Sequence, residues 1–362
     1  MDVATLVAWR MHNQLLWGPP AGSAAAVLDR FAASQGQDLT PSAWALAQRA
    51  GFLTEDAVRA ECDAGAILRT HLLRPTWHFV AAADLRWLLT ATAPRVHRLN
   101  APIYRRWGLD GEALSTVRRV IEHDLADGRH RTRAELGAAL AQAGLPLAGQ
   151  GLAYAVMWAE LEAIVCSGPQ RGRQQTYALV DERAPARDDR PREEALTELA
   201  TRYYAAHGPA SVRDLAGWAS LTLTEARRAT QAAGVTSFEF DGVTYWHAPG
   251  EPPERRPGRV DLVQVLDELV MGYSQTRHLL TGDLVWGEGV PVTFFHAVLA
   301  GGRLIGHWTY ERDGRARPSL LQTRGLRAWN AQETEGVRVA VADFGRFAGS
   351  AVDWVHTPSR GQ

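Results

Sequence analysis

The chain has 362 residues, of which 46% are hydrophobic and 22% charged, values typical of a soluble globular protein. Its length suits two to four small domains or one large one. Its 39 basic and 40 acidic residues give a formal net charge of −1, so any DNA contact must depend on local basic surfaces. No apolar run reaches the ~18 residues of a membrane-spanning helix, and the N-terminus lacks the pattern of a signal peptide. We therefore expect a monomeric cytoplasmic protein with no membrane partner.

The cysteines and histidines do not indicate a metal site. Cys62 and Cys166 lie far apart in the sequence, and without an export signal both are expected to be reduced thiols. None of the twelve histidines is spaced from a cysteine or another histidine as in a ligand motif such as H-E-x-x-H. The sequence therefore predicts no metal and no cofactor.

Lysine is absent, so every one of the 39 basic residues is arginine. A GC-rich genome would explain this composition, which also fits the alanine and glycine content. The chemical consequence holds in either case, because no side-chain amine is present to form a Schiff base with a sugar aldehyde.

The first 90 residues are predicted to form four helices followed by a hairpin. Ser23, Thr40 and Thr54 are each placed to cap a helix, with Pro41 in the first turn of the third. The helices are expected at residues 3–16 and 23–33, from 40 onward, and from 54 to about 65. Residues 67–80 alternate in polarity and predict two short strands.

The same order of elements returns twice further along the chain. Thr132 is expected to cap a helix that ends at residue 142, and residues 151–165 and 164–180 predict a second helix and a basic-tipped hairpin. The next repeat has helices at 212–219 and 225–233 and a hairpin turning at Asp241-Gly242. Two helices followed by a hairpin are typical of a winged helix-turn-helix.

The predicted fold class is α+β, with three tandem winged helix-turn-helix units and a C-terminal antiparallel β domain. The units are expected at residues 1–90, 91–183 and 195–248, separated by charged linkers at 181–194 and 249–258. The C-terminal domain is expected at 259–356. It should begin with a helix at 260–271 and continue mostly as strands from 284, with residues 337–354 forming a helix or further strands.

Residues 34–38, Ser-Gln-Gly-Gln-Asp, form a predicted loop between the second and third helices. Taken alone, such a polar pentapeptide is ordinary surface. Gly36 would allow a close backbone approach, and Asp38 is placed to cap the following helix.

The surrounding segments resemble the winged-helix DNA-binding family that contains the AlkZ-type DNA glycosylases. The resemblance extends over residues 2–350, with its motifs in the expected order. It rests on Gln35-Gly36-Gln37-Asp38, residues 44–46, Arg69 with residues 74–80, residues 207–211 and 221–227, Asp267-Glu268 with Gly272-Tyr273, and Gly302-Arg303 with Gly306 and Trp308.

The resemblance implies a C-shaped scaffold and a catalytic pair, glutamine-x-glutamine or glutamine-x-aspartate, which matches Gln35 and Gln37. The glutamine-x-glutamine branch is similar to self-resistance enzymes that remove bulky N7-alkylguanine adducts or unhook crosslinks. Arg69, Thr76 and His78 match family positions close behind the pair and, with Asp38, would support it, and for His78 a structural role is favoured over a phosphate or water contact. The chain departs from the family at Gly36, where a small aliphatic residue is expected and where glycine would loosen the loop.

Glutamine suits a substrate that already carries a positive charge. An N7-alkylated guanine leaves as a neutral base, so the enzyme needs only to place a water at C1′ and shelter oxocarbenium-like charge. A carboxamide offers donors and an acceptor at fixed geometry but is a poor base. With no lysine, the expected reaction is that of a monofunctional glycosylase that leaves an abasic site.

The expected partner is double-stranded DNA that carries alkylated bases. Arg171 and Arg173, at the tip of the second hairpin, are candidate phosphate contacts or ordinary solvated residues. His296 stands where the family has a different residue and could contact the substrate. The alternative function is that of a non-catalytic DNA-binding protein, either a regulator or an adduct-binding protector, because winged helices fit both functions.

Overall fold

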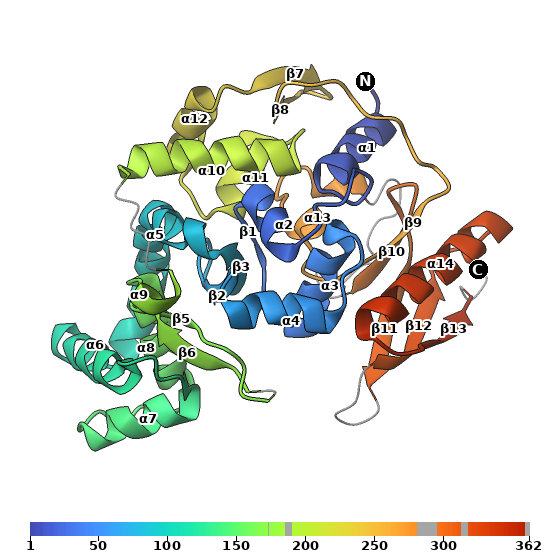
Figure 1. Cartoon of the computed structure of the whole chain (residues 1–362). Helices are drawn as coiled ribbons and strands as arrows, with labels where there is room; N and C mark the ends of the chain where they lie inside the picture. The colour runs from blue at the N-terminus through green and yellow to red at the C-terminus, as the bar shows by residue number, and fades with distance from the viewer. Residues whose placement is uncertain (173, 185–189, 281–294, 313–317, 359–362) are drawn as a thin grey trace.

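The computed structural model describes residues 1–172, 174–184, 190–280, 295–312 and 318–358. In Figure 1 the helices of residues 111–161 form a lobe at one end of the molecule. The C-terminal sheet with its helix forms the other end, and the N-terminal elements lie between the two. Within the described part of the chain, no helix is long and apolar enough to cross a membrane.

Residues 1–81 form four helices and a three-stranded antiparallel sheet in the order β1-β3-β2. The elements are α1 (Val3–Asn13), α2 (Ala24–Phe31), β1 (Ala33–Gln35), α3 (Leu39–Ala50), α4 (Glu55–Ala64), β2 (Ile67–His71) and β3 (Trp77–Ala81). The hairpin and the helix caps at Ser23 and Thr54 are confirmed. The cap predicted at Thr40 is wrong, because Asp38 takes that position and the Thr40 hydroxyl donates to Glu55 at 2.5 Å.

Strand β1 was not predicted. Its three residues are too few to show an alternating pattern, and they pair with β3, more than 40 positions further along the chain, from Ala33 opposite Val80 to Gln35 opposite His78. The predicted loop 34–38 therefore begins as a strand. This pairing fixes Gln35 in the sheet.

The next region packs long helices around a second small sheet in the order β4-β6-β5. Its elements are α5 (Leu85–Arg106), α6 (Gly111–Leu125), β4 (Arg131–Thr132), α7 (Arg133–Gln142), α8 (Gly149–Leu161), β5 (Val165–Ser167), β6 (Thr176–Leu179) and α9 (Val180–Arg183). The Thr132 cap is confirmed and forms a capping box with Glu135. Helix α8 ends earlier than predicted, and Ala163 just beyond it has a positive φ of 54°.

A third group of helices leads into a two-stranded hairpin. It contains α10 (Arg192–His207), α11 (Val212–Trp218), α12 (Leu223–Ala232), β7 (Thr236–Phe240) and β8 (Val243–His247). The turn at Asp241-Gly242 is confirmed, with φ values of 48° and 69° that fit a two-residue hairpin turn. The predicted start of α12 is wrong by two residues, because Thr222 and Glu225 form its capping box.

The C-terminal region is a five-stranded sheet in the order β13-β12-β11-β10-β9, with α14 packed against it. Its elements are β9 (Val260–Val263), α13 (Glu268–Met271), β10 (His296–Ala300), β11 (Arg303–Arg312), β12 (Pro318–Gly325), α14 (Ala331–Ala348) and β13 (Asp353–Thr357). The sheet is mixed, not purely antiparallel, because β12 and β13 run parallel.

The helix predicted at residues 260–271 is wrong over its first part. Residues 260–263 pair with β10 as strand β9, and all four are buried. A short buried apolar strand lacks the alternation that would separate it from a helix. Only residues 268–271 are helical, and this short helix α13 lies next to β1.

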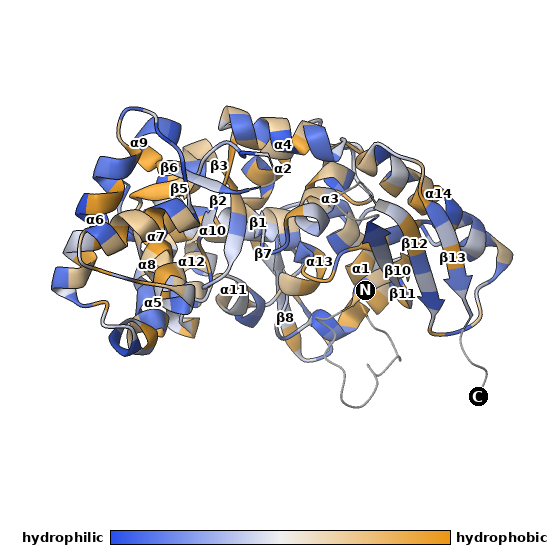
Figure 2. Ribbon diagram, turned by 90° about the horizontal axis from the view of Figure 1, so that it is seen from below, coloured by the Kyte–Doolittle hydropathy of each residue, from blue (hydrophilic) through white to orange (hydrophobic). Residues whose placement is uncertain are grey.

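The hydrophobic core joins the regions instead of stopping at their boundaries. One cluster of buried side chains extends from Ala32 to Tyr273 and includes residues of α5, α8, α10 and α12. A second joins Trp44 of α3 to Phe344 and Phe347 of α14, with ring centroids 5.2 and 5.4 Å apart. In Figure 2 the elements lie in a row from α6 to the C-terminal sheet, with β1 and α13 in the middle. The loop that follows β1 therefore starts in the middle of the molecule.

Candidate active site in the loop between β1 and α3

Gln35 is held in place from both sides of its backbone. It is the last residue of β1, lies opposite His78 in the sheet and is 2% exposed. Its backbone N–H donates to Oε1 of Glu268 at 2.7 Å, and its side-chain Oε1 accepts from the Gly36 N–H at 3.1 Å. The candidate catalytic segment therefore starts at a fixed, buried position.

Gly36 allows the loop to lie directly against β3. Its N–H donates to the Trp77 carbonyl at 2.8 Å. A Cβ at this position would be 3.1 Å from the His78 carbonyl carbon and 3.2 Å from the Phe79 nitrogen, and both of these are backbone atoms. A larger residue would force strand and loop apart by a few tenths of an ångström. Glycine here accompanies a tight contact with β3, not the loosening expected from the sequence.

Arg69 of β2 clamps the backbone of the loop. Its Nε donates to the Gly36 carbonyl at 2.6 Å and its Nη2 to the Gln37 carbonyl at 3.1 Å, while the guanidinium lies 4.0 Å from the centre of the Trp77 ring. Arg69 is only 4% exposed, and burial lowers its pKa to about 10, so it remains a cation at neutral pH. Two loop carbonyls are thus fixed by one buried charge.

Gln37, unlike Gln35, is exposed. Its side-chain Oε1 accepts from the Trp77 N–H at 3.2 Å. Each carboxamide oxygen of the pair therefore faces a backbone N–H, an arrangement that orients both groups. For neither amino group is a partner found in the part of the chain that the structure describes. Each oxygen also has a second lone pair, so the two carboxamides have hydrogen-bonding capacity that the described residues do not use.

Asp38 follows the pair at the N-cap position of α3. The predicted cap position is confirmed, but the Asp38 side chain makes no capping hydrogen bond. The residue is exposed, but the protein around its carboxyl group partly desolvates it and raises its pKa, against the opposing charges of Arg312 and Arg69. Asp38 is therefore an acid close to the pair, with cations on two sides.

His78 and Thr76 support the loop from β3 and the turn before it. The His78 ring is fully buried, Nδ1 donates to the Thr76 carbonyl at 2.9 Å, and Nε2 accepts from Arg74 at 3.2 Å. Burial first, and then the charge of Arg74, lower the pKa of His78 to about 3. A neutral, fully bonded ring favours the structural role. The Thr76 hydroxyl is buried and has no hydrogen-bond partner among the described residues.

The candidate DNA-contact residues lie outside this group. Arg171 is exposed at the hairpin tip and pairs with Glu135 at 2.8 Å, and Arg173 lies outside the described residues. His296, on β10, stacks on Trp308 with ring centroids 4.5 Å apart, and its Nδ1 accepts from the Val265 N–H at 3.0 Å. Burial lowers the pKa of His296 to about 4. His296 packs within the sheet, and its contact with DNA stays a prediction.

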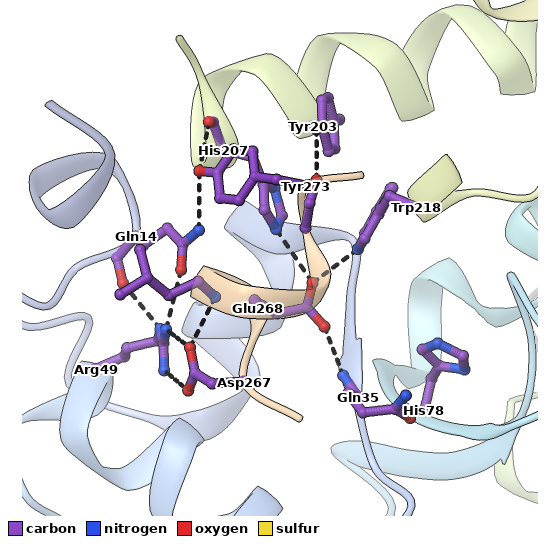
Figure 3. A network of polar contacts seen from close by, with 12 residues as sticks. Gln14, Gln35, Arg49, His78, Tyr203, His207, Trp218, Asp267, Glu268 and Tyr273 are labelled. Carbon is purple, nitrogen blue, oxygen red and sulfur yellow. Dashed lines mark hydrogen bonds and ion pairs between the residues drawn. The ribbon is translucent and has the colours of Figure 1, made fainter. Parts of the chain in front are cut away.

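Two groups of residues that support the loop, one of them through Arg69, are not predicted from the sequence. Ser167 and Gln175, from the β5–β6 hairpin, bond the Arg69 backbone N–H and guanidinium. Glu268, with His207 and Trp218, holds Gln35 (Figure 3). Asp267-Glu268 is part of the family resemblance, but the resemblance implies no role for these two acids, and the sequence predicts only that they lie in a helix at 260–271.

Glu268 is a buried charge. Burial alone would raise its pKa, but the hydrogen bond and charge of His207, the charge of Arg74 and the Gln35 N–H together lower the pKa to about 2. The carboxylate is therefore ionised at neutral pH. Among the described residues, no group of three or more His, Cys, Asp or Glu side chains is arranged to hold a metal ion.

Comparisons with known proteins agree with the resemblance seen in the sequence. The family model described as DNA glycosylase AlkZ-like matches residues 28–347, well over half of the chain. A search of curated proteins finds no match. Among solved structures, the Streptomyces sahachiroi DNA glycosylase AlkZ matches with a TM-score of 0.79 and 19% sequence identity, covering 99% of this chain and 100% of that one, which shows a shared fold. The chain belongs to the AlkZ-like DNA glycosylase family and is therefore an enzyme.

Proposed function

We propose that the enzyme is a monofunctional DNA glycosylase that hydrolyses the N-glycosidic bond of cationic N7-alkylated purines, with Gln35 and Gln37 acting at the reacting sugar. The observation that carries the proposal is the double anchoring of this pair, by Glu268 beneath Gln35 and by Arg69 on the Gly36 and Gln37 carbonyls. Preorganised polar groups are what a reaction needs when its leaving group is already activated.

The chemistry follows from the state of the two carboxamides. Each oxygen has one lone pair directed to a backbone N–H, so the second lone pair can accept from an attacking water, and the amino groups can donate to the lesion or its phosphate. Neither group can remove a proton at neutral pH. Bond breaking must therefore run ahead of water attack, as a cationic base allows.

Bulky adducts or crosslinks are the substrates that we favour within this class, in a self-resistance or repair role. The exposed position of Gln37 is compatible with a large lesion, because the loop is open on that side. Family membership favours this function over the non-catalytic DNA-binding alternative.

We further propose that duplex DNA is held by three winged-helix units, at residues 1–90, 91–183 and 195–248, next to a β domain at 259–356. Each unit contains helices followed by a hairpin, namely β2–β3, β5–β6 and β7–β8. Arg171, at the tip of the second hairpin, is the proposed phosphate contact within the described residues.

A panel of duplex oligonucleotides tests the function. The enzyme should release 7-alkylguanine with EDTA present and leave an alkali-labile abasic site, because the chain offers no lysine for a Schiff-base step. Neutral lesions such as ethenoadenine, hypoxanthine and uracil should remain. Gln35→Ala and Gln37→Ala should each slow excision by ~10² or more. Wild-type rates in both variants, or efficient excision of a neutral base, would rule out the assigned chemistry.

A further inference from the structure

The carboxylate of Glu268 receives hydrogen bonds from three separate segments of the chain. Oε1 accepts from the backbone N–H of Gln35 at 2.7 Å. Oε2 accepts from the indole N–H of Trp218 at 2.7 Å and from Nε2 of His207 at 3.2 Å. Figure 3 shows the carboxylate between these groups, with the Gln35 backbone on the side away from His207. Glu268 is 1% exposed, so water does not compete for these bonds.

The neighbouring residue ties the helix that follows the loop to the same short helix. Asp267 accepts two hydrogen bonds from Arg49, at 2.6 and 2.9 Å, and caps α13 by accepting from the Leu269 N–H at 2.8 Å. Arg49 lies on α3, the helix that begins directly after the loop of residues 34–38, the proposed catalytic loop. The start of the loop is therefore fastened to Glu268, and the helix after it to Asp267.

We propose that Glu268 is a positioning residue that sets the geometry of the Gln35–Gln37 pair by holding the Gln35 backbone. The inference rests on the proposed catalytic role of that pair. A hydrogen bond from a backbone N–H to a carboxylate is about twice as strong as one between neutral groups. The oriented carboxamides depend on it, because a displacement of about 1 Å at a reacting group costs about 100-fold in rate.

A second buried carboxylate distinguishes positioning from general bracing of the fold. Asp214 of α11 is 0% exposed and accepts from the backbone N–H groups of Ser274, Gln275 and Thr276, in the segment that follows α13. Like Glu268, it is a buried carboxyl group that accepts hydrogen bonds from backbone N–H groups close to α13. The structure shows no contact between its side chain and residues 34–38.

Two substitutions at residue 268 test the inference. Glu268→Gln replaces one of the two carboxylate oxygens with an amino group. The new amino group must then face either the Gln35 N–H or the Trp218 N–H, and that hydrogen bond is lost. Glu268→Asp keeps an ionised acceptor but withdraws it from the loop. Each should lower the single-turnover excision rate by about 10- to 100-fold. The affinity for an uncleavable lesion duplex should stay at the wild-type value, because no DNA contact is removed.

Asp214→Asn is the matched control, with all rates compared at equal folded fraction measured by circular dichroism. It should lower thermal stability and leave the excision rate per folded molecule near wild type. Wild-type rates for both Glu268→Gln and Glu268→Asp, together with an inactive Gln35→Ala, would overturn the positioning role and leave the proposed function standing. An equal loss of rate in Asp214→Asn would also overturn it. Wild-type rates in both Gln35→Ala and Gln37→Ala would instead contradict the proposed function itself.

Discussion

The loop of residues 34–38, the proposed catalytic loop, and the tip of the β5–β6 hairpin are both polar turns beside a strand, but different interactions hold them. In the loop, the carbonyls of Gly36 and Gln37 are fixed by Arg69, which is 4% exposed. At the hairpin tip, the Arg171 side chain is 52% exposed and pairs with Glu135 on the surface. Such a surface pair contributes little to stability because water and salt screen it, so its arginine can exchange partners at little cost. The loop therefore has a fixed geometry, whereas the tip is free to make the phosphate contact that we propose.

The largest effect should come from removing the clamp on the loop. Arg69→Met keeps an apolar stem on the Trp77 ring but leaves the Gly36 and Gln37 carbonyls without their donor. We expect single-turnover excision to fall by ~10² because the pair loses its fixed position. The measurement is the excision rate at saturating enzyme on a 7-alkylguanine duplex.

Arg183 provides the control for this variant. It also donates to two backbone carbonyls, those of Cys62 and Asp63 at the end of α4, but it does not touch the catalytic loop. Arg183→Met should keep the wild-type rate per folded molecule. Similar losses of rate in both variants would mean that the Arg69 effect is a general loss of structure.

A smaller effect should follow from widening the gap between loop and strand. Gly36→Ala introduces a Cβ at 3.1 Å from backbone atoms of His78, so loop and strand must shift by a few tenths of an ångström. We expect a rate loss of roughly tenfold, with a loss of stability of about 1 kcal/mol or more. Gly111→Ala, at the start of α6 with no atom within 4 Å of the added Cβ, should leave the rate unchanged. A Gly36→Ala enzyme with the wild-type rate would mean that the tight contact is dispensable.

The sequence predicts the elements whose signals are local. Thr132 and Ser23 cap helices as expected, and the Asp241-Gly242 turn closes its hairpin, because each of these signals depends on neighbouring residues only. Strands β1 and β9 were missed or assigned as helix. Each is a short segment whose partner strand lies more than 30 residues away, so tertiary pairing decides its structure.

The candidate site divides in the same way. Gln35, Gln37, Asp38, Arg69, Thr76 and His78 could be named from the family resemblance, and the structure brings them together around one loop. The contacts of Glu268 with Gln35 and of Gln175 with Arg69 could not be predicted, although Asp267-Glu268 is part of the resemblance, because the partners lie 233 and 106 residues apart. No local pattern reports a contact of that kind.

The buried His78 predicts how the enzyme responds to acid. The folded-state pKa of about 3 lies below the ordinary value of 6.5, so the unfolded chain binds this proton first as the pH falls. The stabilisation is therefore complete above about pH 6.5 and is lost on acidification. By about pH 5 the free energy of unfolding should have fallen by ~2 kcal/mol from this residue alone.

Urea unfolding of the wild type and of His78→Phe, above pH 6.5 and at pH 5, measures the contribution of His78. The free energy of unfolding should fall less between these pH values in the variant than in the wild type. The excision rate per folded wild-type molecule should stay flat over the same range, because the ring remains neutral. A rate that declines with a midpoint near pH 6.5, and does so only while His78 is present, would make this histidine a participant in the reaction.

The smallest effect is expected at the hairpin tip. Arg171→Ala should weaken DNA binding to a similar degree for every sequence, because a phosphate contact carries no base information. The slope of log affinity against log salt should become shallower by about one, the change for one lost contact. The rate of the bound complex should be unchanged, since Arg171 does not touch the loop.

Glu135→Gln sharpens the test, because it keeps the capping box with Thr132 but removes the charge that competes for Arg171. If the arginine exchanges Glu135 for a phosphate, binding should be tighter in Glu135→Gln and weaker in Arg171→Ala, whereas an unchanged salt slope in both variants would leave Arg171 as an ordinary surface residue.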